Sequence, residues 1–153
     1  MIVKIKKLNP RAVIPSKAKK DDFCYDCVAV SEEEIAPNIW KYGLGFSTEI
    51  VRSSSKVYGD PFECHSLSLD FRPRSSIWKT GMVLANSVGT VDEGYRGEIC
   101  AIFYHINTNM PRYKVGDRVC QLKLGITENI EFVQTDELSD TERGSGGFGS
   151  TGK

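Results

Sequence analysis

The sequence predicts a single all-β domain. Its 14 glycines and many β-branched residues are typical of short strands joined by turns. Leu67, Leu69 and Phe71 alternate with polar residues, which places all three on one face of a strand. A length of 153 residues corresponds to about one domain, and such a chain can bury a core without disulfides or a metal.

The overall charge and hydropathy of the chain exclude several classes of protein. The 20 basic and 20 acidic residues cancel, so there is no broad positive field to hold a nucleic-acid backbone. No apolar run reaches about 18 residues, and Met1 to Lys7 alternates instead of forming the apolar core of a signal peptide. The five cysteines are odd in number and scattered, which fits reduced thiols. We therefore expect a cytoplasmic protein that binds neither nucleic acid nor a membrane.

Three strands are expected in the first third of the chain. Residues 2–8 alternate apolar and basic side chains, as an exposed or subunit-pairing strand would, and residues 23–30 and 45–51 also have the character of strands. Asp26 lies among cysteines and apolar residues of the second strand. A carboxylate in such surroundings must be paired or hydrogen-bonded, so Asp26 is either a site residue or half of a buried salt bridge.

The segments between these strands are expected to be irregular. Residues 31–34 resemble a helix start or an acidic turn, but Pro37 and Gly43 follow too soon for a long helix. The serine-rich segment from Arg52 to His65 has the composition of a surface loop.

The stretch from Gly89 to Glu98 concentrates a carboxylate, an aromatic ring, an arginine and three glycines within ten residues. It follows an apolar run at 82–85, and its glycines predict a rigid hairpin that presents Asp92 and Tyr95 to a small ligand. Ordinary turn chemistry, with Tyr95 as a packing residue, is the alternative. Beyond it, residues 99–106 are apolar on both faces, which predicts a strand packed between layers or against another subunit.

Two further segments carry groups that can bind phosphate. Arg72 to Ser76 holds two guanidinium groups and two hydroxyls, although a solvated turn is the alternative. After a last short strand at 130–133 comes a glycine-rich tail that cannot bury a core of its own. Its arginine, amides and aromatic ring could close over a phosphorylated ligand with a stackable base, and a disordered tail is the alternative. We expect a β domain over 1–134 and a flexible tail over 135–153.

These segments, in this order, resemble the trimeric all-β dUTPases from about residue 2 to residue 152. Five motifs carry the resemblance: Cys24 to Val28, Pro73 to Ser76, Gly89 to Gly97, Gly116 to Leu122, and Arg143 to Gly152. The fifth motif is the most specific of them, because a ten-residue glycine-rich match with its arginine and phenylalanine in place rarely arises by chance. The chain departs from the family at Cys24, where glycine is usual, and at Trp78, where a small residue is common.

The resemblance implies a jelly-roll-like distorted β-barrel and a homotrimer with an exchanged or closing C-terminal tail. It implies hydrolysis of dUTP to dUMP and pyrophosphate, with Asp92 as the general base for water attack on the α-phosphate. Asp26 and Arg118 would form a supporting pair, and Mg²⁺ would be held by the triphosphate and water instead of by side chains. The substrate-binding residues that it implies are Arg74, Ser75, Ser76, Asn86, Gly89, Val91, Tyr95, Gln121, Arg143, Gly147, Phe148, Gly149 and Ser150.

Two alternative functions are compatible with the same motifs. The dCTP deaminases share the fold, but they carry a catalytic glutamate in the strand after the predicted hairpin, where this chain has Ile102. The second alternative is a dUTPase-like regulatory binding module, for which the segment from Arg52 to His65 is the candidate contact with a partner.

Overall fold

Strands make up nearly all of the regular structure in residues 1–52 and 65–147, which are the residues that the computed structural model describes. The strands are β1 (Ile2–Lys7), β2 (Tyr25–Val28), β3 (Ser31–Ala36), β4 (Ile39–Gly43), β5 (Phe46–Val51), β6 (His65–Arg72), β7 (Met82–Leu84), β8 (Gly89–Asp92), β9 (Cys100–His105) and β10 (Arg118–Glu128). A short 3-10 helix, η1 (Ser75–Lys79), lies between β6 and β7. The prediction of an all-β fold is confirmed.

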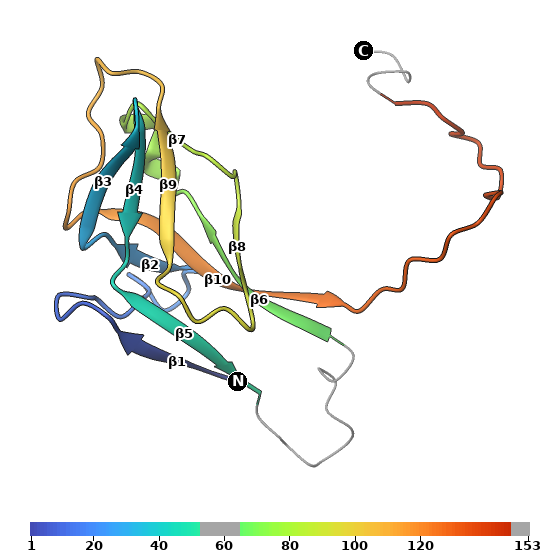
Figure 1. Ribbon diagram of the computed structural model, residues 1–153, viewed down its shortest axis with the longest axis horizontal. Helices are drawn as coiled ribbons and strands as arrows, with labels where there is room; N and C mark the ends of the chain where they lie inside the picture. Colours follow the sequence, from blue (N-terminus) through green and yellow to red (C-terminus); the bar gives the residue numbers. More distant parts are fainter. Residues whose placement is uncertain (53–64, 148–153) are drawn as a thin grey trace.

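The strands form three antiparallel sheets (Figure 1). One four-stranded sheet has the order β2-β10-β6-β8, the other has the order β3-β4-β9-β7, and β1 and β5 form a separate two-stranded sheet. The buried core draws on every sheet, with Leu69 from β6, Phe103 from β9 and Phe46 from β5 in one cluster. In β6 the predicted alternation is confirmed, because Leu67, Leu69 and Phe71 are all buried.

The segment from residue 31 to residue 43 is a β-hairpin, and the expectation of irregular structure there was wrong. β3 pairs with β4 around a tight turn at Asn38, whose φ of 61° is a conformation that asparagine tolerates. The acidic side chains of β3 do not prevent pairing, since Glu32 accepts a hydrogen bond from Arg112 and Glu33 pairs with Lys41. β3 is the edge strand of its sheet, where charged side chains are common.

The stretch from Gly89 to Glu98 is a crossover between two sheets, and the predicted hairpin was wrong. β8 pairs with β6, whereas the next strand, β9, pairs with β4 and β7. Two of its three glycines allow the close approach of a ring: a Cβ at Gly89 would meet the ring of Phe71, and one at Gly97 would meet the ring of Tyr95, whereas Gly94 has open space around it.

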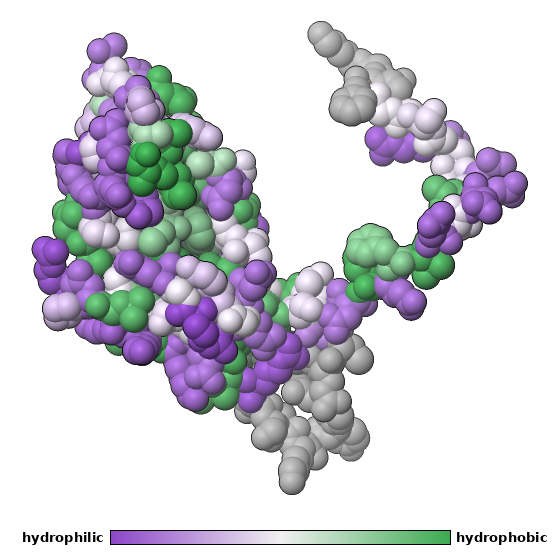
Figure 2. Space-filling model, viewed as in Figure 1, coloured by the Kyte–Doolittle hydropathy of each residue, from purple (hydrophilic) through white to green (hydrophobic). Residues whose placement is uncertain are grey.

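β9 is buried on one face only within the chain. Ala101 and Phe103 point into the core, but Tyr104 is exposed and Ile106, just beyond the strand, is 71% exposed. Figure 2 shows hydrophobic side chains on the upper part of the body, where Figure 1 places the sheet of β3, β4, β9 and β7. Packing of this face against another subunit therefore stays a prediction.

The chain leaves the body of the fold after β10 (Figure 1). The last strand that was expected, at 130–133, is not present among the described residues, because no partner strand of the same chain reaches it. Phe132 is 90% exposed, and apolar residues stand out along this segment in Figure 2. We call residues 129–147 the C-terminal arm.

Candidate functional site

The first of two candidate pockets lies where β2, β10 and the turn before η1 meet. We call it the Arg74 pocket. It has a volume of about 360 Å³ and is lined by Ala18, Asp22, Phe23, Cys24, Asp26, Arg74, Ser75 and Gln121. Four of these residues, Asp26, Arg74, Ser75 and Gln121, are ones that the sequence placed in a site, and the fold brings them together from three separate segments.

Asp26 holds two arginines at this pocket. Its Oδ1 accepts a hydrogen bond from Arg74 Nε at 2.9 Å, and its Oδ2 accepts one from Arg118 Nη1 at 3.0 Å. The Asp26 side chain is 17% exposed, whereas that of Arg118 is 51% exposed. The expected Asp26–Arg118 pair is therefore present, and Arg74 is a second partner that the sequence did not reveal. Since both carboxylate oxygens are occupied, Asp26 fixes the direction in which the Arg74 guanidinium points.

The turn before η1 is tied to β10 by Gln121. Gln121 lies opposite Asp26 in the β2–β10 register, and its Nε2 donates to the carbonyl of Pro73 at 3.1 Å. Ser75 opens η1, and Arg74 Nη1 lies 3.4 Å from Ser76 Oγ. A guanidinium, two hydroxyls and an amide thus converge, which is a donor set suited to phosphate oxygens.

The second pocket lies along β8 and the crossover that follows it. We call it the Asp92 pocket. It has a volume of about 290 Å³ and is lined by Phe71, Asn86, Thr90, Val91, Asp92, Tyr95, Glu98, Ile99 and Cys100. Four predicted residues therefore share one pocket: the proposed base Asp92 and the substrate-binding candidates Asn86, Val91 and Tyr95.

The backbone turn after β8 sets the position of Tyr95. Its amide donates to the carbonyl of Asp92 at 3.0 Å, and its hydroxyl donates to the carbonyl of Glu98 at 3.1 Å. The ring lies over Gly97, where any side chain would collide with it. Val91 is buried, so its side chain belongs to the core and only its backbone could contact a ligand.

Several lining residues were missed by the reasoning from sequence. Thr90 and Glu98 line the Asp92 pocket, and Asp22 and Phe23 line the Arg74 pocket. Cys24 belongs to the first motif, but no role in the site was assigned to it. All five lie inside a predicted motif or within two residues of one, and that proximity was the available signal.

Among the described residues, the predicted site residues are divided between two pockets and the C-terminal arm. The two pockets have no lining residue in common. Arg143 and Gly147 lie on the C-terminal arm, where Arg143 Nε donates to the carbonyl of Gly146 at 3.0 Å. Phe148, Gly149 and Ser150 lie outside the described residues, as does most of the expected loop, residues 53–64.

The described residues contain neither a candidate metal cluster nor a helix that could span a membrane. Among them there is no group of three or more His, Cys, Asp or Glu side chains that could hold a metal ion. In the same residues no helix is long and apolar enough to cross a bilayer.

Cys27 and Cys120 face each other across β2 and β10. The hydrogen bond with Cys120 and the burial of the site raise the pKa of Cys27, so that its thiol stays protonated.

Comparison with known proteins places the chain in a family. A model of the dUTPase family matches residues 65–152. The deoxyuridine 5'-triphosphate nucleotidohydrolase of Nautilia profundicola is 36% identical over 155 residues, an alignment that covers 100% of both chains. The chain belongs to the dUTPase family.

Two solved structures agree with this fold. The dUTPase of Staphylococcus bacteriophage 80alpha with dUPNHPP has a TM-score of 0.74 at 22% identity and covers 99% of both chains. A dUTPase mutant from phage phi11 of S. aureus, described with the coordination of a structural Mg(II) ion, has a TM-score of 0.67 at 17% identity. It covers 92% of this chain and 100% of the phage chain.

Proposed function

We propose that this chain hydrolyses dUTP to dUMP and pyrophosphate in the cytoplasm. The observation that carries the proposal is the content of the Asp92 pocket. The fold brings Asn86, Asp92 and Tyr95 to one pocket of about 290 Å³, and the family resemblance implies that Asp92 is the general base and that Asn86 and Tyr95 bind the substrate. The family membership and the phosphate-binding donors of the Arg74 pocket support the same reaction.

Recognition of the nucleoside follows from the shape of the Asp92 pocket. The Asn86 amide and the backbone around β8 form hydrogen bonds with the polar edge of uracil. The pocket leaves no room for the methyl group of thymine. Tyr95 packs beneath the deoxyribose, and its ring is fixed by Gly97 below it and by its hydrogen bond to Glu98. A ribose 2′-hydroxyl would collide with this ring.

Asp92 is the general base of the reaction. It lies at the end of β8 with an exposed side chain in the pocket, so it can hold a water molecule and take its proton. The water oxygen forms the new bond to the α-phosphorus, and the bond from that phosphorus to the bridging oxygen breaks as pyrophosphate leaves. Arg74, oriented by Asp26, offsets the charge on the phosphates together with Ser75, Gln121 and Arg143.

The residues present fit Mg²⁺ that arrives with the substrate. Both carboxylate oxygens of Asp26 accept hydrogen bonds from arginines. The described residues also contain no cluster of side chains that could hold a metal ion without the substrate. Mg²⁺ keeps several water ligands and commonly binds through substrate phosphates with one or two carboxylates nearby. Asp22 is the other carboxylate of the Arg74 pocket, and it would be the one to bind water ligands of the ion. When bound, the ion neutralises phosphate charge in the transition state.

The active site is shared between subunits of a homotrimer. Because the two pockets have no lining residue in common and the arm stands away from both, one chain supplies separate parts of a site. Completion by neighbouring subunits joins these parts. Each subunit then consists of a β domain over residues 1–134 and a closing tail over residues 135–153.

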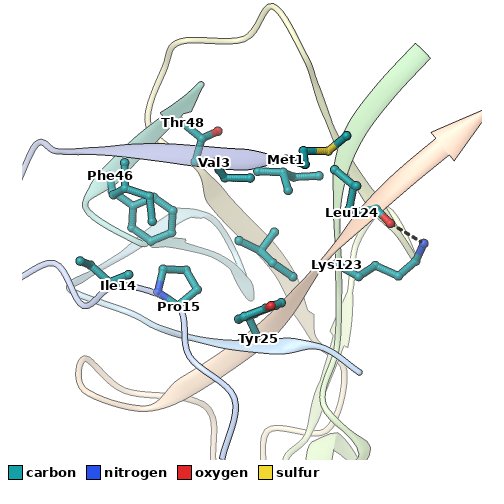
Figure 3. A pocket seen from close by; sticks show the side chains of 12 residues that line it. Met1, Val3, Ile14, Pro15, Tyr25, Phe46, Thr48, Lys123 and Leu124 are labelled. Atoms are coloured by element: carbon teal, nitrogen blue, oxygen red, sulfur yellow. Dashed lines mark hydrogen bonds between the residues drawn. The ribbon is translucent and has the colours of Figure 1, made fainter. Parts of the chain in front are cut away.

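A cavity beside β1 fits the arm of another subunit. It has a volume of about 350 Å³ and is lined mainly by apolar side chains, as Figure 3 shows: Met1, Val3, Ile5, Ile14, Pro15, Tyr25, Phe46, Thr48, Leu69, Leu122, Lys123 and Leu124. Among the described strands β1 pairs only with β5, so its other edge is open. In an extended arm Ile130 and Phe132 point to the same side, and both are exposed in the single chain.

Truncations separate the two roles of the arm. Deleting the residues after Glu142 removes Arg143 and the glycine-rich motif but keeps Ile130 and Phe132, so hydrolysis should be lost while the trimer persists. Deleting the residues after Glu128 should also lower the mass measured by light scattering to that of a smaller species. A trimer that survives the longer deletion contradicts exchange of the arm.

Substrate specificity is the direct test of the proposed reaction. Pyrophosphate release is measured from dUTP, dCTP, dTTP and UTP in parallel, with Mg²⁺ and with a chelator. Release from dUTP in excess of the others supports the proposal, and ammonia release from dCTP would replace it with deamination. Asp92→Asn should bind a nonhydrolysable dUTP analogue and lose most turnover; retained turnover removes Asp92 as the base.

A further inference from the structure

The crossover from Asp92 to Glu98 is held by the two ends of one strand, β5. At the start of β5, the amide of Gly45 donates to Glu98 Oε1 at 2.8 Å. At the other end, Arg52 follows β5 directly and binds Glu93. The two acidic residues that bracket Tyr95 are thus each fixed to an opposite end of the same strand.

The Arg52–Glu93 contact has two parallel hydrogen bonds. Arg52 Nε donates to Glu93 Oε1 at 3.0 Å, and Arg52 Nη2 donates to Glu93 Oε2 at 2.8 Å. Both side chains are about two-thirds buried, and Nη2 also donates to the carbonyl of His65 at 2.9 Å. The guanidinium therefore ties the crossover to the end of β5 and to the start of β6 at once, in a planar geometry that lysine cannot reproduce.

The backbone on the far side of Glu93 is also constrained. Arg96 Nη1 donates to the carbonyl of Glu93 at 2.7 Å and to the carbonyl of Tyr95 at 3.0 Å. Both hydrogen bonds of Arg96 therefore join residues of the same turn. Its side chain is exposed, and neither bond connects the turn with another strand. Among the described contacts, the Glu93 side chain therefore joins this turn through Arg52 to the end of β5 and the start of β6.

We infer that Arg52 and Glu93 are positioning residues, which hold the turn from Asp92 to Tyr95 so that the base and the sugar-facing ring keep one geometry. Neither side chain lines the Asp92 pocket, so the pair acts through its neighbours. The inference rests on the proposed function for its effect on catalysis, whereas the effect on the turn does not depend on it.

A purely stabilising role for this pair would give a different pattern. β5 is already paired with β1 over its whole length, and Ile99 donates its amide to the carbonyl of Phe46 at 3.0 Å, so the sheet itself stays in place without Arg52. What the pair adds is restraint on the turn. Loss of that restraint should appear first in the backbone of the turn and in sugar discrimination.

Hydrogen exchange of the unliganded protein tests the restraint directly. In Arg52→Gln and in Glu93→Gln the amide of Tyr95, which is bonded to the carbonyl of Asp92 at 3.0 Å, should exchange about tenfold faster than in the wild type. Glu49→Gln is the matched control. Glu49 lies on β5 and forms an exposed ion pair with Lys4 of β1, so this substitution should leave the exchange of the Tyr95 amide unchanged.

Kinetics then test the consequence for the reaction. Arg52→Gln should lower kcat/KM for dUTP by about tenfold and lower the ratio of dUTP to UTP turnover, and the exchanged pair Arg52→Glu with Glu93→Arg should recover part of both. A lower Tm with unchanged Tyr95 exchange and an unchanged dUTP to UTP ratio would overturn the inference. If the Tyr95 amide exchanges faster in the variants but the wild type does not hydrolyse dUTP, the restraint on the turn is supported and the proposed function is refuted.

Discussion

Replacing Asp26 with asparagine tests whether Arg74 is a phosphate ligand that depends on its carboxylate partner. Asparagine keeps the shape of the side chain but has one oxygen, so it can accept from only one of the two arginines and has no charge. Arg74 Nε, now 2.9 Å from Asp26 Oδ1, or Arg118 Nη1 at 3.0 Å must lose its acceptor.

The loss of stability follows from the burial of the two arginines. A hydrogen bond to a charged group contributes about 1.5–3 kcal/mol, and the Arg74 contact lies at a part-buried carboxylate. The Arg118 side chain is 51% exposed, so its contact should contribute only about 0.2–1 kcal/mol. We expect Asp26→Asn to cost about 2–3 kcal/mol in the free energy of unfolding, or roughly 6–9 °C in Tm for a chain of this length.

The assay compares Asp26→Asn with Asp70→Asn. Asp70 is buried to a similar degree, forms an ion pair with Lys123 at 3.4 Å on the neighbouring strands, and does not line the Arg74 pocket. Thermal unfolding should show that both variants are destabilised. Pyrophosphate release as a function of dUTP concentration should show a raised KM for Asp26→Asn alone, with kcat/KM lower by about 100-fold because the guanidinium is no longer oriented.

Equal KM values for the two variants would refute the reasoning. In that case the Asp26–Arg74 pair would be a structural salt bridge, and phosphate binding would have to rest on Ser75, Gln121 and the arm. Conversely, a stable Asp26→Asn variant with a raised KM would mean that the Arg74 pocket is held by its backbone and that only the charge of Asp26 matters.

Two further predictions concern packing and pH. Gly89→Ala should lower the free energy of unfolding by about 1–3 kcal/mol, because the added methyl meets the ring of Phe71. Gly94 has open space around it, so Gly94→Ala should change that free energy by less than about 0.5 kcal/mol. Thermal unfolding measures both. Burial alone would raise the pKa of Glu32, but hydrogen bonds from Arg112 and a backbone amide hold that pKa below its usual range. The stabilisation is therefore present above the unfolded-state pKa and is lost as the pH falls through the folded-state value. In urea denaturation the gap between wild type and Glu32→Gln should be wide at neutral pH and shrink below about pH 4.

Strands with one buried face could be predicted from the sequence, because burial imposes a period of two on their side chains. β6 is the clearest case, with Leu67, Leu69 and Phe71 all in the core. β3 carries no such period: its acidic residues face solvent or partners far along the chain, such as Arg112 for Glu32. A charged edge strand depends on contacts that no local pattern contains.

The crossover after β8 could not be told from a hairpin by its local sequence. Glycines and an acidic turn fit both, and the choice depends on whether the next strand joins the same sheet. For the site, the motif residues around Asp26 and Asp92 were predicted to act together. Their division between two pockets reflects tertiary packing, since β2 and β8 are the two outer strands of one sheet, with β10 and β6 between them.

In the proposed trimer, the position of β5 would connect the arm of one subunit with the site of another. Phe46 and Thr48 of β5 line the cavity that we assign to the arm, while Gly45 and Arg52 at the ends of the same strand hold the crossover. Filling the cavity would restrain β5 along its length, and that restraint passes to the crossover through two hydrogen-bonded carboxylates. If the arm binds in this cavity, a single strand would couple assembly with site geometry, and an arm that brings the glycine-rich motif to a site would also stabilise the turn that carries Asp92.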